Sequence, residues 1–380
     1  MNITFDAQLL MKGEITGIGW CAENILHCMP QYQNNLTLNC FTLGYNENQF
    51  GNVLKYRELG YKIEKCGWFH DVIYRILCNL IPVPYSLFYH KRTDITIFFN
   101  YIVPPGVKGR KITFVYDMAF KSYPETVRYK TKHMLNIGLQ KSCKRADKII
   151  TISEFSKGEI IRYLGISEDK IVVMPCGVDF TKYHPNYTMD EVDEVKKKYH
   201  ITEDYLLYLG TLEPRKNIIR LIQAYAQLKA ANSRIPKLVL AGRKGWMYDS
   251  IFATVKELQL EDDLIFTGYI EAQEAPILMK GALAFLFPSL YEGFGMPPLE
   301  AMACGTPVLV SNAASLPEVV GDAGVYVDPM STQSIREGIE YLLESEDLRS
   351  DLSRRGMERA QLFSWDRSAE IVDQAIRELK

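Results

Sequence analysis

The stretch AFLFPSLYEGFGMPPLEAMA, residues 284–303, holds the strongest structural signal in the chain. Its first residues, 284–287, form a short apolar run, which predicts a buried strand. A helix is predicted over residues 297–303. Between the two, Gly293 and Gly295 allow positive φ and let a ligand approach the backbone closely. The stretch therefore predicts a strand, a tight turn and a helix whose N-terminal N–H groups can face a ligand.

Two carboxylates frame this turn, because Glu292 and Glu300 stand eight positions apart. A carboxylate accepts paired hydrogen bonds, so two such groups suit the binding of vicinal hydroxyls. The same spacing also fits a solvated Glu292 at a plain corner and a first-turn Glu300 that the helix dipole stabilises. On spacing alone both interpretations stay open.

Short apolar strands alternate with helical segments along the whole chain. Strands are predicted over 1–7, 39–43, 93–100, 111–116, 148–152, 171–174, 205–209, 237–241, 264–266, 284–287, 308–311 and 324–327, and helices over 20–29, 130–145, 154–164, 217–230 and 250–258. This alternation predicts βαβ units and parallel sheets. About a dozen strands exceed one ordinary sheet, so we predict an α/β fold of two doubly wound, Rossmann-like domains. The polar run 179–204 is the expected boundary between them.

Ligands of doubly wound sheets bind outside the carboxyl ends of the strands. Two such domains facing a central cleft would bring both binding edges together. This arrangement suits an enzyme that joins two substrates.

The composition and the charge distribution limit the class of protein. Of the 380 residues, 47% are hydrophobic and 24% are charged, which excludes a disordered tail, a collagen-like repeat and a small disulfide scaffold. The formal net charge of −2 hides two halves of opposite sign. Residues 1–185 hold 23 Lys and Arg against 16 Asp and Glu, a net of +7, whereas residues 186–380 hold 21 against 30, a net of −9. This asymmetry suggests a different partner for each half.

Several kinds of site and segment are missing from the sequence. The eight cysteines form no C-x-x-C pair and the six histidines show no ligand spacing, so we expect reduced thiols and no metal site. There is no D-x-D, P-loop, H-E-x-x-H or G-x-S-x-G motif. No apolar run reaches the ~18 residues of a membrane-spanning helix, and residues 1–10 lack the basic region of a secretory signal. We expect a cytoplasmic protein that needs no metal ion or cofactor.

A second charged turn, GTLEPRKN at 210–217, follows the strand predicted over 205–209. Arg215 and Lys216 stand there at the N-terminus of a predicted helix, where side-chain donors add to the positive end of the helix dipole. This predicts an anion site, with a diphosphate as its ligand, in which two cations neutralise charge without a metal ion. A solvated basic pair is the alternative.

Two weaker features lie in the first half of the chain. Gly17 and Gly19, in the loop 13–19, let a ligand approach the backbone, but position 22 is Ala and position 39 is Asn, so the dinucleotide fingerprint is incomplete. Asp117 ends the strand predicted over 111–116, where a side chain reaches a binding edge. A turn aspartate that caps the next segment fits equally well.

Residues 68–92 mix aromatic, aliphatic and basic side chains, from Trp68 to Lys91 and Arg92. Such a segment suits an interface with anionic lipid. It also fits an ordinary core helix followed by a loop. Under the first interpretation, the acceptor is a lipid-linked saccharide at the inner face of a membrane.

In combination, these segments resemble a known family, the retaining, nucleotide-sugar-dependent glycosyltransferases of the GT-B fold, family 4 type. The resemblance extends over nearly the whole chain, and its segments occur in the family's order. They are the glycines at 17–19, SEFSK at 153–157, VMPCGVD at 173–179, GTLEPRKN at 210–217, LVLAGRKGW at 238–246, FTGYI at 266–270, FPSLYEGFGMPPLEAMACGTPV at 287–308, SNAASLPEVVGDAG at 311–324 and FSWDRSAE at 363–370.

The resemblance implies a role for each matching residue. Arg215 and Lys216 would bind the donor diphosphate, Glu292 the donor sugar and Glu300 the ribose hydroxyls. Asp117 matches the family, but Tyr116 replaces the His that usually touches the donor sugar. The implied catalytic residues are Asp117, Arg215, Lys216 and Glu292, and the implied donor-binding residues are Gly17, Gly19, Tyr116, Arg215, Lys216, Gly268, Tyr269, Ile270, Glu292, Gly293, Phe294, Gly295 and Glu300.

The resemblance also implies a domain plan and a reaction. Residues 1–180 would bind the acceptor, with the helix 365–380 crossing back to them, and residues 181–364 would bind the donor. The reaction would move a hexose with retention, by a front-face route in which the acceptor proton goes to the leaving phosphate or to Asp117.

The implied partners are a nucleotide sugar, a saccharide or lipid-linked saccharide and an anionic membrane surface, with no nucleic acid. GDP-mannose is favoured over a UDP-hexose as the donor. Two alternatives stay open: a sugar-nucleotide epimerase or hydrolase on the same fold, and a non-catalytic nucleotide-sugar-binding protein.

Overall fold

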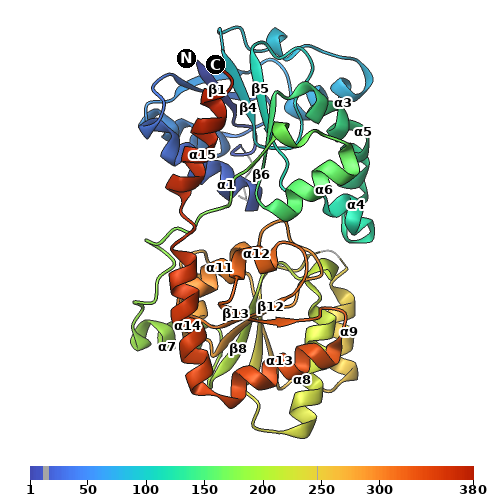
Figure 1. Ribbon diagram of the computed structural model, residues 1–380, viewed down its shortest axis with the longest axis vertical. Coiled ribbons are helices and arrows are strands. Elements are labelled where there is room, and N and C mark those ends of the chain that lie inside the picture. The colour runs from blue at the N-terminus through green and yellow to red at the C-terminus, as the bar shows by residue number, and fades with distance from the viewer. Residues whose placement is uncertain (12–16, 246) are drawn as a thin grey trace. The chain divides into compact units, whose positions relative to one another are not determined.

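The computed structural model describes residues 1–11, 17–245 and 247–380, which form two compact units. Unit 1 consists of Met1–Gly177 and Trp365–Lys380, and unit 2 consists of Val178–Ser364, so both ends of the chain belong to unit 1 (Figure 1). The predicted divisions lie after residues 180 and 364. Of the predicted loop 13–19, residues 13–16 lie outside the described residues, as does Trp246 of the segment 238–246.

Unit 1 contains a parallel sheet with the strand order β3-β2-β1-β4-β5-β6-β7. Ile3 of the central strand pairs with Leu36 on one side and with Ile95 on the other. The apolar side chains of the central strands are buried, as expected for a parallel sheet covered on both faces. The strands are β1 (Ile3–Asp6), β2 (Leu36–Phe41), β3 (Lys62–Cys66), β4 (Ile95–Phe98), β5 (Arg110–Phe114), β6 (Lys148–Thr151) and β7 (Ile171–Val173).

Helices pack on both faces of this sheet, and the last helix of the chain, α15, lies beside α1 (Figure 1). The Ser368 hydroxyl of α15 donates to the carbonyl oxygen of Pro175 at 2.6 Å, which ties the returning helix to unit 1. Ser153 caps α6 as predicted, since its hydroxyl accepts from the Ser156 N–H at 3.0 Å. The helices are α1 (Gly17–Cys28), α2 (Glu47–Leu54), α3 (Asp71–Leu80), α4 (Ala119–Ser122), α5 (Tyr129–Arg145), α6 (Glu154–Leu164) and α15 (Trp365–Arg377).

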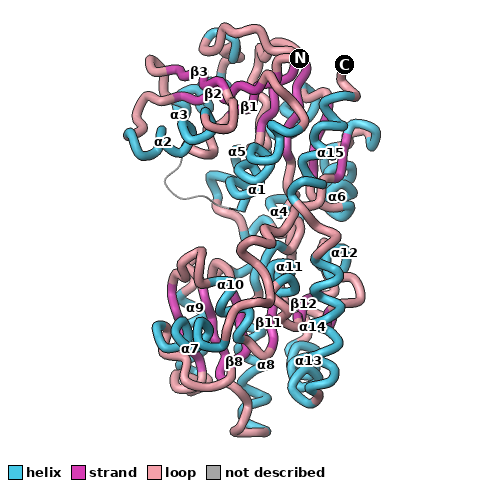
Figure 2. Tube along the Cα trace, turned by 90° about the vertical axis from the view of Figure 1, so that its left-hand side faces the viewer, coloured by secondary structure: helices cyan, strands magenta, loops and turns pink. Residues whose placement is uncertain are grey.

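Unit 2 repeats this architecture around a parallel sheet with the order β10-β9-β8-β11-β12-β13, and Figure 2 shows its strands between layers of helices. The strands are β8 (Tyr205–Leu209), β9 (Lys237–Ala241), β10 (Leu264–Gly268), β11 (Ala284–Phe287), β12 (Val308–Ser311) and β13 (Gly324–Val327). The helices are α7 (Met189–Lys198), α8 (Ile218–Ala231), α9 (Asp249–Glu257), α10 (Ala275–Gly281), α11 (Met296–Ala303), α12 (Leu316–Val320), α13 (Thr332–Glu344) and α14 (Glu346–Ala360). The predicted fold class, an α/β fold with two doubly wound sheets, is confirmed.

Two local features add to the expectation. Strand β3 was not predicted, because it is an edge strand whose charged side chains reach solvent and hide the strand pattern. The polar run 179–204, the expected boundary, begins directly after the division at Gly177, lies within unit 2 and contains α7. A capping box between Thr188 and Glu191 starts that helix, and its Thr-x-x-Glu spacing is readable in the sequence.

In each sheet the strand order reverses once, between β1 and β4 in unit 1 and between β8 and β11 in unit 2. Within each pair, the connections that follow the two strands run toward opposite edges of the sheet. This opens a crevice at the carboxyl ends of the two strands. We call these places the switch points of the two units. Loops from β8 and β11 place charged residues at the switch point of unit 2.

Candidate functional site

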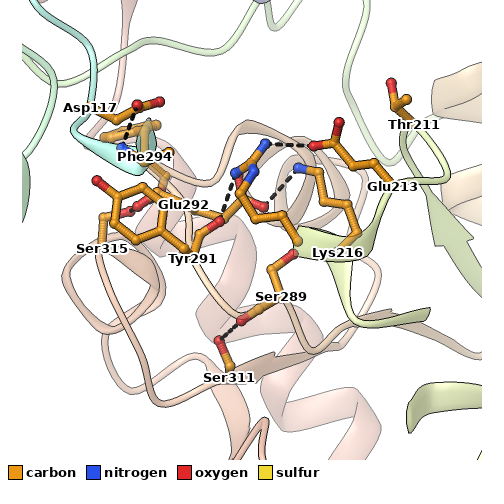
Figure 3. A network of polar contacts seen from close by, with 12 residues as sticks. Asp117, Thr211, Glu213, Lys216, Ser289, Tyr291, Glu292, Phe294, Ser311 and Ser315 are labelled. Atoms are coloured by element: carbon orange, nitrogen blue, oxygen red, sulfur yellow. Dashed lines mark hydrogen bonds and ion pairs between the residues drawn. The ribbon is translucent and has the colours of Figure 1, made fainter. Parts of the chain in front are cut away.

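Two basic side chains close on one buried carboxylate at the switch point of unit 2. Lys216 Nζ lies 2.7 Å from Oε1 of Glu292, and Arg215 Nη1 lies 3.1 Å from Oε2. Arg215 also donates to the carbonyl oxygen of Tyr291 at 2.6 Å and pairs with Glu213 at 2.9 Å. Figure 3 shows Lys216 and Glu292 pointing toward each other within this cluster. The structure thus brings together three of the four predicted catalytic residues.

Burial decides between the interpretations that the sequence left open. Lys216 is 9% exposed and Glu292 is 7% exposed, so neither a solvated basic pair nor a solvated glutamate describes this turn. The ion pair is instead a buried one, in which each charge depends on its partners for stabilisation.

The electrostatics keep the carboxylate ionised. Burial works to raise the pKa of Glu292, but the charges of Arg215 and Lys216 outweigh it and hold this pKa below its ordinary value of 4.5. Burial lowers the pKa of Lys216 from its ordinary value, and the attraction of Glu292 opposes that shift. At neutral pH Glu292 therefore accepts hydrogen bonds and is not a proton donor.

Hydrogen bonds from Asn217 fix the relative positions of the two loops. This residue adopts a left-handed backbone conformation with φ of 62° between the turn Pro214–Lys216 and α8. Its side-chain amide donates to the carbonyl oxygens of Pro288 at 2.9 Å and Pro329 at 2.7 Å, at the ends of β11 and β13. The Leu290 N–H also donates to the carbonyl oxygen of Arg215 at 2.9 Å. Strand ends that are far apart in sequence are thereby joined into one rigid edge.

The glycine turn before α11 is held by Ser315. Its buried hydroxyl contacts the carbonyl oxygens of Glu292 at 2.9 Å and Phe294 at 2.7 Å. Gly295 has φ of +118°, and a Cβ there would lie 2.7 Å from Leu316 Cδ2, so the turn requires glycine. The backbone of Gly293–Gly295 is therefore fixed before any ligand arrives.

Glu300 lies on α11, as predicted, but in a different environment from Glu292. Its partners are the Tyr183 hydroxyl, through a hydrogen bond, and the charge of Lys182. Burial raises the pKa of Glu300 to about 7, because these two partners offset the loss of hydration only in part. This carboxylate consequently changes its charge near neutral pH.

The segment predicted to face a nucleotide base lies at the end of β10. Gly268 has φ of +71° and ends the strand, while Ile270 is buried. Tyr269 is 56% exposed, and the guanidinium carbon of Arg243 lies 4.0 Å from its ring centroid. The stacked pair of Tyr269 and Arg243 offers a flat surface with a positive charge.

The remaining predicted site residues belong to unit 1. Asp117 Oδ1 accepts from the N–H of Ala119, the first residue of α4, at 3.0 Å, which is the contact of a turn aspartate. Tyr116 is 3% exposed and its ring packs on Tyr101 and Phe114. Gly17, which is exposed, and Gly19, which is buried, lie in the first turn of α1.

Comparison with known proteins identifies the family. A model described as "Glycosyl transferases group 1" matches residues 191–359, and one described as "Glycosyltransferase Family 4" matches residues 68–182. The O-antigen chain mannosyltransferase B of Escherichia coli is 38% identical over 275 residues, which is 70% of either chain. The chain is a family 4 glycosyltransferase.

Two further comparisons support the assignment and the fold. The glycosyltransferase is 31% identical over 241 residues to the O-antigen chain mannosyltransferase RfbU of Salmonella typhimurium, which covers 63% of either chain. The crystal structure of Anabaena Alr3699/HepE in complex with UDP and glucose superposes with a TM-score of 0.71 at 18% identity, over 100% of this chain and 98% of that one. The protein is therefore a GT-B enzyme related to mannosyltransferases of surface polysaccharide biosynthesis.

Several residues of the glycosyltransferase site were not predicted, among them Glu213 and Ser315. Glu213 lies in the turn 210–217, two positions before Arg215. Its negative charge is the sequence signal for an ion pair with Arg215. Ser315 gives no such signal, because its contacts depend on how α12 packs against the glycine turn. Among the described residues, no group of three or more His, Cys, Asp or Glu side chains is placed to hold a metal ion. No described helix is long and apolar enough to cross a membrane.

Proposed function

We propose that this glycosyltransferase moves a hexose from a nucleotide diphosphate sugar to a hydroxyl of a lipid-linked saccharide, with retention and without a metal ion. The cluster of Arg215, Lys216 and Glu292 at the switch point of unit 2 carries the proposal. It offers two cations and the N-terminal end of α11 where a diphosphate would gain charge as it leaves. Unit 2 then holds the donor and unit 1 the acceptor.

The proposed reaction breaks the bond between the anomeric carbon and a diphosphate oxygen, and the electron pair goes to the diphosphate. The acceptor oxygen forms its new bond on the same face, and its proton goes to the leaving phosphate oxygen, with Asp117 as the alternative acceptor. Glu292 is a poor nucleophile, because its carboxylate is paired with two cations. Its proposed role is therefore to orient the sugar by hydrogen bonds. Glu300 would accept the ribose hydroxyls and Tyr269 would stack on the base.

We favour GDP-mannose as the donor, because the curated relatives are named mannosyltransferases. A UDP-hexose is the alternative, since the structural neighbour from Anabaena was solved with UDP and glucose. The acceptor class follows the O-antigen names of the relatives, and the net charge of +7 in residues 1–185 favours work at an anionic membrane surface.

The test is a metal-free titration of the whole protein with GDP-mannose, UDP-glucose and GDP. Release of nucleoside diphosphate from the sugar is followed with and without a chelator. Binding of at least one donor, with turnover unaffected by chelation, would support the proposal. Loss of turnover on chelation would contradict the metal-free mechanism, and binding without any turnover would favour a binding protein. Formation of an isomeric nucleotide sugar would favour an epimerase.

A further inference from the structure

The switch point of unit 1 holds a cavity of about 330 Å³. Asp6 at the end of β1, Phe98 at the end of β4 and Phe41 at the end of β2 form its floor. Helices α3 and α5 supply the walls together with the loop after β4, through Asn100, Ile102, Pro104 and Pro105. Ligands of doubly wound sheets bind at this place, and the volume lies within the roughly 300–1,000 Å³ of ligand pockets.

The walls of the cavity are mostly apolar. Phe41, Tyr74 and Phe98 present aromatic rings, which pack on one another and on neighbouring aromatic residues in the core of unit 1. Aliphatic side chains such as Ile76 of α3 and Ile137 of α5 complete the surface. A free saccharide needs many hydrogen-bond partners, so this lining suits an apolar chain better.

The charged residues that line the cavity have an excess of positive charge. Arg75, Lys141 and Arg145 face a single acidic group, Asp6. Arg145 is anchored, because its guanidinium donates twice to the carbonyl oxygen of Val103, at 2.7 and 3.0 Å. Arg75 lies 3.7 Å from Asp71, and Lys141 makes no ion pair with any residue that the structure describes. A ligand with a phosphate head is complementary to this set.

The apolar surface continues outside the cavity along α3. Val72 and Ile76 line the cavity and are 50% and 56% exposed, and Ile73 beside them is 51% exposed. The predicted segment 68–92 therefore combines a core face, through Tyr74, with an exposed apolar face. A chain longer than the cavity has a surface on which to continue.

We propose that this cavity receives the lipid anchor of the acceptor, with the chain against the apolar walls and the anchor phosphate at Arg75, Lys141 and Arg145. The proposal rests on the lipid-linked acceptor of the proposed function, and it names the site that would hold that lipid. Its chemical class is a single-chain anionic amphiphile bound as one molecule, as distinct from a bilayer surface.

Gly138 provides the decisive variant. It lines the cavity in the middle of α5, where helix propensity favours a larger side chain over glycine, and Gly138→Leu is chosen to reduce the cavity volume. Gly158→Leu on α6 is the matched control, because a Cβ there meets no atom within 4 Å. Lys144→Gln on α5, outside the cavity lining, is the charge control for Lys141→Gln.

The experiment measures binding of monomeric dodecyl phosphate to the whole protein by calorimetry, and protection of the Cys78 thiol, which lines the cavity, from N-ethylmaleimide. We expect one molecule to bind and to protect Cys78. Gly138→Leu should weaken binding at least tenfold and Lys141→Gln about threefold, while both controls bind like the wild type. Inorganic phosphate should neither bind comparably nor protect Cys78.

Three outcomes would overturn the proposal. They are unchanged binding by a folded Gly138→Leu variant, binding of dodecyl phosphate without protection of Cys78, and binding only to anionic vesicles with no difference between Gly138→Leu and the wild type. The last outcome would indicate a membrane-docking surface. GDP-mannose and UDP-glucose are titrated in parallel: if neither binds the wild type, the proposed function fails, whereas the effect of Gly138→Leu still tests the lipid site separately.

Discussion

At the switch point of unit 2, two cations close on a buried carboxylate, whereas at the switch point of unit 1 apolar side chains surround a cavity of about 330 Å³. Both places have the same topology. In each sheet the first strand, β1 or β8, lies beside the strand at which the strand order reverses, β4 or β11. The difference comes from the residues at the strand ends. The fold supplies a crevice twice, and a few side chains assign one crevice to a charged ligand and the other to an apolar one.

The origin of the lining residues also differs. Two loops, 210–217 and 288–295, supply the cations, the carboxylate and the glycine turn of unit 2, so short motifs carry the chemistry. The cavity of unit 1 takes its lining from three strand ends, two helices and the loop after β4. The site in unit 2 is made by short loop motifs and binds one kind of chemical group. The site in unit 1 is made by the packing of several elements, so its shape and the charges at its rim determine what it binds.

The largest expected effect is on donor hydrolysis, which should depend on the switch point of unit 2 and not on that of unit 1. Lys216→Met removes a cation from the leaving diphosphate, and we expect release of nucleoside diphosphate from the donor to fall by about 10²–10³ in kcat. The matched variant Arg75→Met removes a cation from the other switch point and should leave this acceptor-free hydrolysis within about twofold. Equal losses in both variants, measured in a nucleotide-release assay, would contradict the division of labour.

The second prediction compares how two buried carboxyls, Glu292 and Asp6, affect the free energy of unfolding. Glu292→Gln breaks a buried ion pair and should cost about 3 kcal/mol at pH 8. Because ionisation of Glu292 is favoured by folding, the stability it contributes is present above its ordinary pKa of 4.5 and is lost as the pH falls. The cost of Glu292→Gln should therefore shrink in acid.

The pKa of Asp6 is shifted in the opposite direction from that of Glu292. Burial raises the pKa of Asp6 above its ordinary value of 3.8, even though Arg75 and hydrogen bonds from Gln8 and Tyr85 oppose the shift. Its ionisation therefore reduces stability as the pH rises through that raised pKa, and Asp6→Asn should be at least as stable as the wild type at pH 8. Calorimetric unfolding at about pH 3.5, below the ordinary pKa of both carboxyls, and at pH 8 compares the two variants. A large loss in Asp6→Asn at pH 8 would show that the Asp6 carboxylate is needed in its ionised form.

Much of the fold and part of the site can be predicted from the sequence. Central strands such as β8, β9 and β11 are apolar runs that end in glycine or proline, and their bounds match the prediction. The mutual ion pairs of the cluster are not predictable, whereas its residues are predictable one by one, because the two cations share one turn and Glu292 lies in a strand–turn–helix segment. Both are local signals.

Other features depend on tertiary packing and leave no local trace. The Ser315 contacts and the burial of Tyr116 follow from which elements pack together. The cavity in unit 1 is the clearest case, because Asp6, Ile76 and Gly138 have nothing in common in the sequence and become neighbours only when β1, α3 and α5 are placed.

The third prediction concerns pH and the donor. Because the pKa of Glu300 is about 7, only about a tenth of these carboxyls are ionised at pH 6. If the ionised form binds the ribose hydroxyls, the affinity for GDP-mannose should fall about tenfold from pH 8 to pH 6. The intact nucleotide sugar is used since it has no terminal phosphate that titrates in this range. Glu300→Gln should bind weakly with no such dependence, and an identical pH profile in this variant would remove Glu300 from the ribose site.

The smallest expected effect concerns the base. Tyr269→Ala removes an exposed ring on which Arg243 stacks at 4.0 Å, and we expect binding of a nucleoside diphosphate to weaken about fivefold, or about 1 kcal/mol. Inorganic pyrophosphate has no base, so its affinity should stay unchanged in this variant. Tyr248→Ala is the control, because Lys244 lies 5.1 Å from that ring in a comparable contact outside the predicted base segment. Equal weakening of both ligands in Tyr269→Ala would mean that the ring supports the fold of the diphosphate site. Weakening of the nucleotide alone would assign the end of β10 to base recognition and complete the contrast with the switch point of unit 1, where the bound group is an apolar chain.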